Sequence, residues 1–230
     1  MTTGLNIGIG VFGLVVGWLL WVAVERVPDR RPLLAGPFPE LRSAARQPLG
    51  LAVILTTGAL FAGIAAQLED VWELPAFLVL AAALVVLSAI DLRHFILPNR
   101  IVYPLTGVTL LLLAGAAAAN DDFDPLLRAL GCAVGAFLAF MTLHLISPRS
   151  MGFGDVKLSF VLGLALGWLG VGETVVGLFF GFVYGAVIGV LLIATRIRTR
   201  KDHVPFGPFL AAGAVTAVLI GDVIVDWYRG

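Results

Sequence analysis

The chain has 230 residues, of which 60% are hydrophobic and 13% charged, and its mean hydropathy is +1.01. A soluble domain has roughly 45–50% apolar and about 25% charged residues, so this composition excludes an ordinary soluble protein and predicts an integral membrane protein. The 15 basic and 15 acidic residues give a formal net charge of zero, so nothing in the charge balance indicates a nucleic-acid partner.

Eight apolar segments follow one another along the chain, each close to the roughly 20 residues that a membrane-spanning helix needs. The segments cover residues 7–24, 49–68, 74–92, 101–119, 126–146, 156–169, 174–195 and 206–225. This pattern predicts an all-α, polytopic helix bundle that forms a single membrane domain over residues 1–230. Gly163 and Gly167 interrupt the short sixth segment, and only residues 170–172 separate it from the seventh, so the boundary between these two segments is left open.

Basic residues are distributed unevenly between the connections. They gather after the first, third, fifth and seventh segments, while the alternate connections are mainly acidic. The set is Arg26, Arg30, Arg31, Arg42, Arg46, Arg93, Arg100, Arg149, Lys157, Arg196, Arg198, Arg200 and Lys201, with only Arg128 and Arg229 on the other side. The positive-inside rule then places these connections in the cytoplasm and both termini on the opposite side.

Two aspartates lie at the borders of these apolar segments. Asp91 closes the third segment, and Asp155 stands at the start of the sixth. A carboxylate near lipid is costly, so each is by default a functional hypothesis. The expected topology puts both at the same depth on the cytoplasmic side, where they can meet.

A pair of carboxyl groups suits peptide hydrolysis. Two such groups in one site cannot both ionise cheaply, so the pair is expected to share one proton. The ionised group can take a proton from water while the protonated group donates a hydrogen bond to the scissile carbonyl, without a metal or another cofactor. Gly152 and Gly154 permit positive φ and close approach of a substrate. Lys157 either stabilises the anionic pair or extends to the lipid headgroups.

Plainer structural roles were weighed for the same residues. Asp91 can be a helix-end residue paired with Arg93, and Asp155 can be a helix N-cap. Pro98 and Asn99 are typical of a turn, with Asn99 capping the fourth segment.

The histidines and the cysteine, which are common metal ligands, are not spaced along the sequence as a metal site. His94, His144 and His203 are not spaced as a ligand cluster, and His144 is expected to be a hydrogen-bonded core residue. Cys132 is the single cysteine, so no internal disulfide or CxxC pair is possible, and it is expected to pack as a small hydrophobic residue.

Three stretches resemble the signatures of one family. DLRHFILPN at 91–99 resembles an aspartate followed by an aliphatic-Pro-Asn element, GFGDVKL at 152–158 resembles G-x-G-D-x-K-L, and PFGPFL at 205–210 resembles a Pro-Phe-Gly-Pro element before a final helix. In this order the stretches are similar to those of the type IV prepilin peptidase (leader peptidase) family, which belongs to the GxGD-type membrane aspartyl proteases.

The resemblance implies a function and a set of site residues. Asp91 and Asp155 would be catalytic, and the supporting residues would be Gly152, Gly154, Lys157, Pro98 and Asn99. The chain would be a multi-pass protein of a prokaryotic inner membrane that cleaves the basic leader from a prepilin or pseudopilin precursor at the cytoplasmic face, in pilus assembly or protein secretion. The stretch PFGP at 205–208 is interpreted as scaffold.

The chain departs from this family in one loop. Many members carry two zinc-binding CxxC pairs after the first helix, a loop associated with N-methylation of the new pilin terminus. The corresponding cytoplasmic loop here, residues 25–48, is short and contains no cysteine. The loop is expected to be irregular and to carry no Cys₄ zinc site, and N-methylation is therefore in doubt.

Two other functions fit some of the same features. An ion-coupled transporter also carries intramembrane carboxylates and broken helices, but both aspartates lie near one face and no inverted repeat is evident. A non-catalytic assembly protein could keep the fold, although a scaffold has no need for paired buried charges. The sequence leaves open the identity of the precursor and the oligomeric state.

Overall fold

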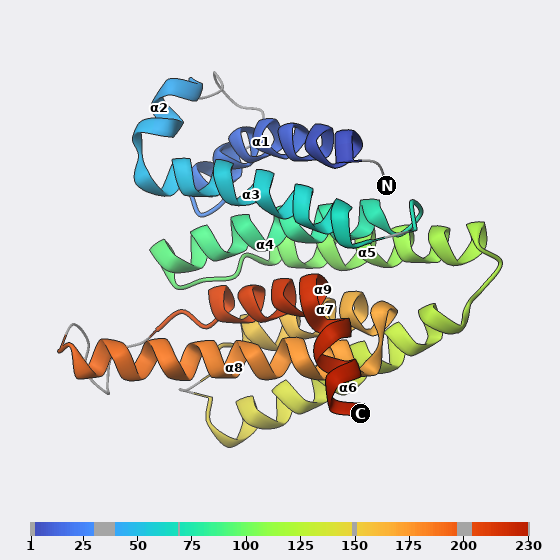
Figure 1. Ribbon diagram of the computed structural model, residues 1–230. Coiled ribbons are helices and arrows are strands. Elements are labelled where there is room, and N and C mark those ends of the chain that lie inside the picture. Colours follow the sequence, from blue (N-terminus) through green and yellow to red (C-terminus); the bar gives the residue numbers. More distant parts are fainter. Residues whose placement is uncertain (1–2, 30–39, 69, 149–150, 197–203, 230) are drawn as a thin grey trace.

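The computed structural model describes residues 3–29, 40–68, 70–148, 151–196 and 204–229, and regular structure within these ranges is entirely helical (Figure 1). The helices are α1 (Thr3–Arg26), α2 (Leu41–Arg46), α3 (Pro48–Gln67), α4 (Leu74–His94), α5 (Asn99–Ala119), α6 (Asp124–Ile146), α7 (Phe153–Leu169), α8 (Val171–Ala194) and α9 (Gly207–Arg229). The predicted all-α membrane bundle is confirmed.

Seven helices of the described chain, all except α2 and α7, are long and apolar enough to cross a membrane. The sixth expected segment forms α7, but its 17 residues span only about 26 Å. That is shorter than the roughly 30 Å of a bilayer's hydrocarbon core. The glycines in this segment do not interrupt the helix. A Cβ at Gly163 would lie 2.6 Å from the Cys132 carbonyl oxygen, so the missing side chain allows α6 to pack directly on α7.

The boundary between α7 and α8 is a single residue. Gly170, with φ 170° and ψ 166°, ends α7 and precedes α8, which therefore begins at Val171 rather than at residue 174 as expected. A Cβ at Gly170 would collide with the end of the flexible Glu173 side chain, which would then have to move.

The loop after α1 contains a helix that the sequence analysis did not expect. Residues 30–39 lie outside the described chain, but Leu41–Arg46 form α2 where an irregular loop was expected. The Ala44 carbonyl oxygen lies against Gly50, which leaves no room for a side chain on that glycine. Several of the basic residues from which the topology was inferred lie outside the described residues, namely Arg30, Arg31, Arg149, Arg198, Arg200 and Lys201.

Two helices occupy the centre of the bundle. α4 packs against α1, α3, α5, α7 and α9, and α7 packs against α4, α5, α6, α8 and α9. Twelve residues are buried in each, so both are apolar on every side. Each of these central helices carries one of the two aspartates.

The C-terminal end of α7 is anchored by polar contacts. Arg128 on α6 donates a hydrogen bond from Nε to the Gly167 carbonyl (2.9 Å), satisfying an acceptor that the helix end leaves free. The Trp168 indole N–H donates to the Glu73 carboxylate (2.5 Å), just before α4. Burial raises the pKa of Glu73, and the bond from Trp168 opposes that rise. These contacts fix α7 at the end opposite Asp155.

In Figure 1 the α4–α5 connection lies at the left end of the bundle, whereas the start of α1 and the end of α9 lie toward the right, at the upper and lower edges of the bundle. Arg93 and Arg100 flank that connection, so they lie at the end of the bundle where α4 stops and α5 begins.

Glycine packing between α8 and α9 generates a test of the fold. A Cβ at Gly213 would fall 2.5 Å from the Gly181 amide nitrogen and would also collide with the Gly177 carbonyl. Because backbone cannot move aside as a side chain can, Gly213→Ala should lower the free energy of unfolding by about 1–3 kcal/mol, measured by denaturant titration in detergent. Gly189→Ala on α8, where a Cβ meets nothing within 4 Å, is the matched control and should be neutral or stabilising. Equal effects of the two substitutions would contradict this packing.

Candidate active site

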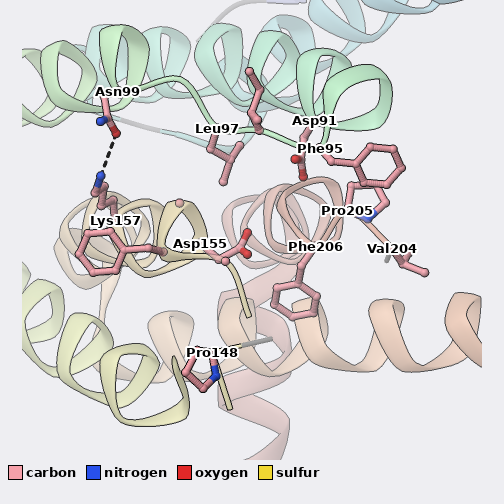
Figure 2. A pocket seen from close by; sticks show the side chains of 14 residues that line it. Asp91, Phe95, Leu97, Asn99, Pro148, Asp155, Lys157, Val204, Pro205 and Phe206 are labelled. Atoms are coloured by element: carbon pink, nitrogen blue, oxygen red, sulfur yellow. Dashed lines mark hydrogen bonds between the residues drawn. The ribbon is translucent and has the colours of Figure 1, made fainter. Parts of the chain in front are cut away.

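Asp91 and Asp155 face the same cavity. Asp91 lies in the last turn of α4 and Asp155 in the first turn of α7. The two side chains are only 4% and 7% exposed, yet both line a cavity of about 360 Å³. Figure 2 shows the two carboxylates pointing into it from opposite walls. The structure therefore brings together two acidic groups that are 64 residues apart in the sequence (155 − 91).

The first residue of α9 holds Asp91. The Gly207 N–H donates a hydrogen bond to Asp91 Oδ2 at 3.1 Å. This N–H is one of those left free at a helix start, and the positive end of the helix dipole favours an anion there. A Cβ at Gly207 would lie 2.8 Å from the same oxygen, so only glycine allows the contact.

Sequence reasoning missed Gly207, because the stretch at 205–208 was interpreted only as scaffold. The available signal was a glycine between two prolines at the start of a helix, where a backbone donor is free and a side chain is absent. Pro205 and Phe206, from the same stretch, line the cavity as well.

Asp155 is supported by the turn before α7. Its carboxylate lies over Gly152, where a Cβ would be 3.2 Å from Oδ2, and its backbone N–H donates to the Gly152 carbonyl at 3.0 Å. The N-cap of α7 is Gly152 rather than Asp155, so the N-cap role weighed for this aspartate is wrong. Neither glycine uses the positive φ that it permits: Gly152 has φ −68° and Gly154 is helical. Both glycines instead let neighbouring side chains come close, the Asp155 carboxylate at Gly152 and Leu97 at Gly154.

Lys157 lies on one side of the cavity and points to Asn99 (Figure 2). Its ammonium donates to Asn99 Oδ1 at 2.9 Å and lies 4.7 Å from the centre of the Phe153 ring and 5.2 Å from that of Tyr103. It therefore contacts an amide and two ring faces, an arrangement that holds a partly desolvated cation.

The expected cap of the fourth segment is wrong. Asn99 is the first residue of α5 and makes no side-chain cap, because its side chain binds Lys157 instead. Pro98 is the N-cap residue, and its carbonyl accepts from the N–H groups of Ile101 (2.9 Å) and Val102 (3.1 Å). Pro98 thus shapes the entry to α5, whereas Asn99 lines the cavity.

Pairing with Arg93 was the alternative structural role for Asp91, but the Arg93 side chain stacks on a residue of another helix. Its guanidinium lies 4.8 Å from the centre of the Trp21 ring on α1.

The apolar residues that line the cavity could not be recognised from the sequence. Phe95 ends α4 in a left-handed conformation (φ 55°) that is uncommon for a bulky residue. Leu97 packs against Gly154, where a Cβ would come 2.9 Å from the Leu97 Cβ. The loop between α4 and α5 therefore covers the start of α7 only because position 154 lacks a side chain.

Within the described ranges, no group of three or more His, Cys, Asp or Glu side chains is arranged to hold a metal ion. His144 Nδ1 makes a hydrogen bond with the Met151 carbonyl at 2.8 Å, which confirms the expected hydrogen bond, but the side chain is half-buried rather than in the core. His203 lies outside the described residues. Cys132 is half-buried and packs against α7, as expected of a small apolar residue.

The fold and this cavity define a helical membrane protein with a pair of buried carboxyl groups at one end. Residues 78–193, which contain both aspartates, match the type IV leader peptidase family. The chain belongs to this family, as the sequence motifs indicated, and it is a multi-pass inner membrane protein.

Several curated bacterial proteins are similar to the chain over most of its length. The prepilin leader peptidase/N-methyltransferase of Aeromonas hydrophila is 34% identical over 192 residues, covering 80% of this chain and 62% of the relative. The protein of the same name from Bacillus subtilis is 29% identical over 76% of this chain and 67% of the relative. The protein of the same name from Pseudomonas aeruginosa is 32% identical over 76% of this chain and 60% of the relative. The chain thus spans about three-fifths of the length of the first of these relatives, and no solved structure matches it.

The contact between Leu97 and Gly154 generates a test of the cavity wall. Gly154→Ala should lower the free energy of unfolding by about 1–3 kcal/mol, because the new methyl group displaces Leu97. In the Leu97→Gly background, which removes the Leu97 Cβ, the same substitution should cost less, with a coupling energy of about 0.5–3 kcal/mol. Denaturant titration of the two single variants and the double variant measures this coupling. Strictly additive effects would show that the two residues do not touch.

Proposed function

We propose that the chain is a membrane aspartic endopeptidase that removes the basic leader peptide from type IV prepilin-like precursors. The single observation that carries the proposal is the pair of buried carboxyl groups, Asp91 and Asp155, facing one cavity at one end of the bundle. Membership of the leader peptidase family and the names of the relatives support the same activity.

The proposed site of cleavage is the cytoplasmic membrane edge. Arg93, Arg100 and Lys157 lie beside the cavity end of the bundle, and the positive-inside rule favours that end as cytoplasmic. Both termini would then lie on the opposite side. A precursor with a single apolar helix and a cytoplasmic basic leader would present its junction at this depth.

The geometry favours a division of labour between the aspartates. The Gly207 N–H and the start of α9 stabilise negative charge on Asp91, so Asp91 is the proposed base. It takes a proton from a water molecule, whose oxygen attacks the scissile carbonyl carbon. Asp155, holding the shared proton, donates to the carbonyl oxygen. The peptide C–N bond then breaks as the departing amine receives a proton from the pair.

Lys157 and Asn99 are proposed as supporting residues rather than as reacting groups. Their mutual hydrogen bond joins α7 to α5 on one side of the cavity. Gly152 and Gly154 keep the backbone beside Asp155 free of side chains, and Pro98 sets the entry to α5.

N-methylation is not part of this proposal. The relatives are named for both activities, but the loop at 25–48 contains no cysteine to form a zinc site. Transport is also not proposed, because both carboxylates lie at one end of the bundle rather than at its middle.

Replacing either aspartate should abolish processing. Asp91→Asn and Asp155→Asn should each lower kcat by about a hundred- to ten-thousand-fold or more, because each removes one partner of the acid–base pair. The measurement is the mass of the product after incubating purified protein with a precursor. Asp226→Asn, at an exposed position near the far end of α9, is the matched control and should process normally. Normal processing by either active-site variant would refute the assignment.

Metal removal should leave the activity unchanged. The proposed reaction uses only the carboxyl pair and water, so EDTA should not slow cleavage of the same precursor. An enzyme inactivated by EDTA and restored by zinc would require a different mechanism.

A further inference from the structure

A groove of about 350 Å³ lies on the face shared by α3, α4 and α9. We call it the α3–α4–α9 groove. Its lining is apolar or small, with two hydroxyl groups, from Thr56 and Ser88, and no charged side chain. Such a surface does not suit a soluble polar ligand, but it matches an apolar helix packed side by side with the protein.

The groove begins beside Asp91 and extends away from it. Its cavity-end residues are Leu49 near the start of α3, Leu92 next to Asp91, and Pro208 next to Gly207. From there it follows α3 as far as Leu60, about 17 Å at 1.5 Å per residue. It follows α9 to Val215, about 10 Å. The groove therefore accommodates two to three turns of a helix lying alongside the bundle.

Small side chains allow a second backbone to come close. Ala52, Ala89, Ala211 and Ala212 line the groove together with Ser88. Ala52 and Ala212 are exposed, so the groove is open to the outside of the bundle on both its α3 and its α9 side. Packing through small residues is how helices associate in a membrane, where no hydrophobic force drives them together.

We propose that this groove holds the hydrophobic helix of the precursor, an inference that rests on the proposed peptidase function. The occupant must be apolar, must lie in the same membrane, and must present its cytoplasmic end to Asp91. An extended chain advances about 3.3 Å per residue, so three or four unwound residues beyond Leu92 and Pro208 carry the cleavage site about 10–13 Å, into the catalytic cavity.

A second groove provides a contrast. It has a volume of about 380 Å³ and lies between α5, α6 and α7, on the other side of the site. Lys157 lines it, so an apolar helix packed there would bury a charged side chain, which the first groove does not require. Gly107, in this second groove, is exposed and has open space around it.

Filling the first groove should weaken binding of the full precursor without changing the chemical step. The double variant Ala52→Leu/Ala212→Leu should raise KM about tenfold or more and leave kcat nearly unchanged, as expected for lost uniform binding. The matched control Gly107→Leu fills the second groove and should leave KM unchanged. Unfolding midpoints of all three proteins in detergent show whether the fold is kept.

Cross-linking locates the precursor helix independently of KM. Thr56→Cys is placed in a Cys132→Ala, Asp155→Asn background, so that the precursor stays uncut and no other thiol is present. Precursors carry one cysteine at successive positions of the apolar helix. Disulfides should form at positions spaced by three or four residues, because only one helix face meets the groove. Gly107→Cys in the same background should form none.

The outcomes separate the two proposals. A wild-type protein that processes no precursor refutes the peptidase function itself. Normal processing with an unchanged KM in the double variant, or an equal rise in KM for Gly107→Leu, refutes only the groove assignment. A cross-link between Thr56→Cys and a second copy of the chain would assign the groove to that copy and overturn the groove proposal. Loss of a co-purified lipid from the double variant, with KM unchanged, would assign the groove to lipid and overturn the proposal as well.

Discussion

The hydrogen bond from the Gly207 N–H to the Asp91 carboxylate joins the last helix of the chain to the helix that carries the first aspartate. A buried carboxylate among apolar helices is costly unless something stabilises its charge. Here the stabilising group is backbone, supplied by the start of α9, and it requires position 207 to lack a side chain. The site therefore depends on where α9 begins, and so on everything that positions α9.

α9 is positioned by glycine contacts with α8. Gly213 faces the backbone of Gly177 and Gly181, so the two helices are in direct main-chain contact. Gly163 and Gly167 play the same part between α7 and α6, and α7 carries the second aspartate. These glycines thus serve the close approach of helices rather than turns. These contacts fix α9, whose first residue binds Asp91, and α7, which carries Asp155.

The cavity faced by Asp91 and Asp155 and the α3–α4–α9 groove suit the two environments that the proposed reaction requires. Hydrolysis needs water and an unwound substrate, and irregular backbone at membrane depth is tolerated only beside water or inside protein. The cavity at the end of α4 offers polar groups from Asp91, Asp155, Lys157 and Asn99. The groove offers none of these charges and extends along the apolar helices. A precursor that is polar before its cleavage site and apolar after it suits this pair of surfaces.

The sequence by itself determined the membrane class, the helical segments, the two aspartates and the family, because long apolar runs and rare charges within them are local signals. It also indicated, through charge bias, that Asp91 and Asp155 share one end of the bundle. Only the tertiary structure decided that Gly207 holds Asp91, that Lys157 binds Asn99, that Leu97 covers Gly154, and that one glycine separates α7 from α8. Apart from that short connection, these contacts join residues far apart in the chain through backbone groups, apolar atoms or missing side chains. Hydropathy and spacing carry no record of such contacts, since they arise only when the helices pack.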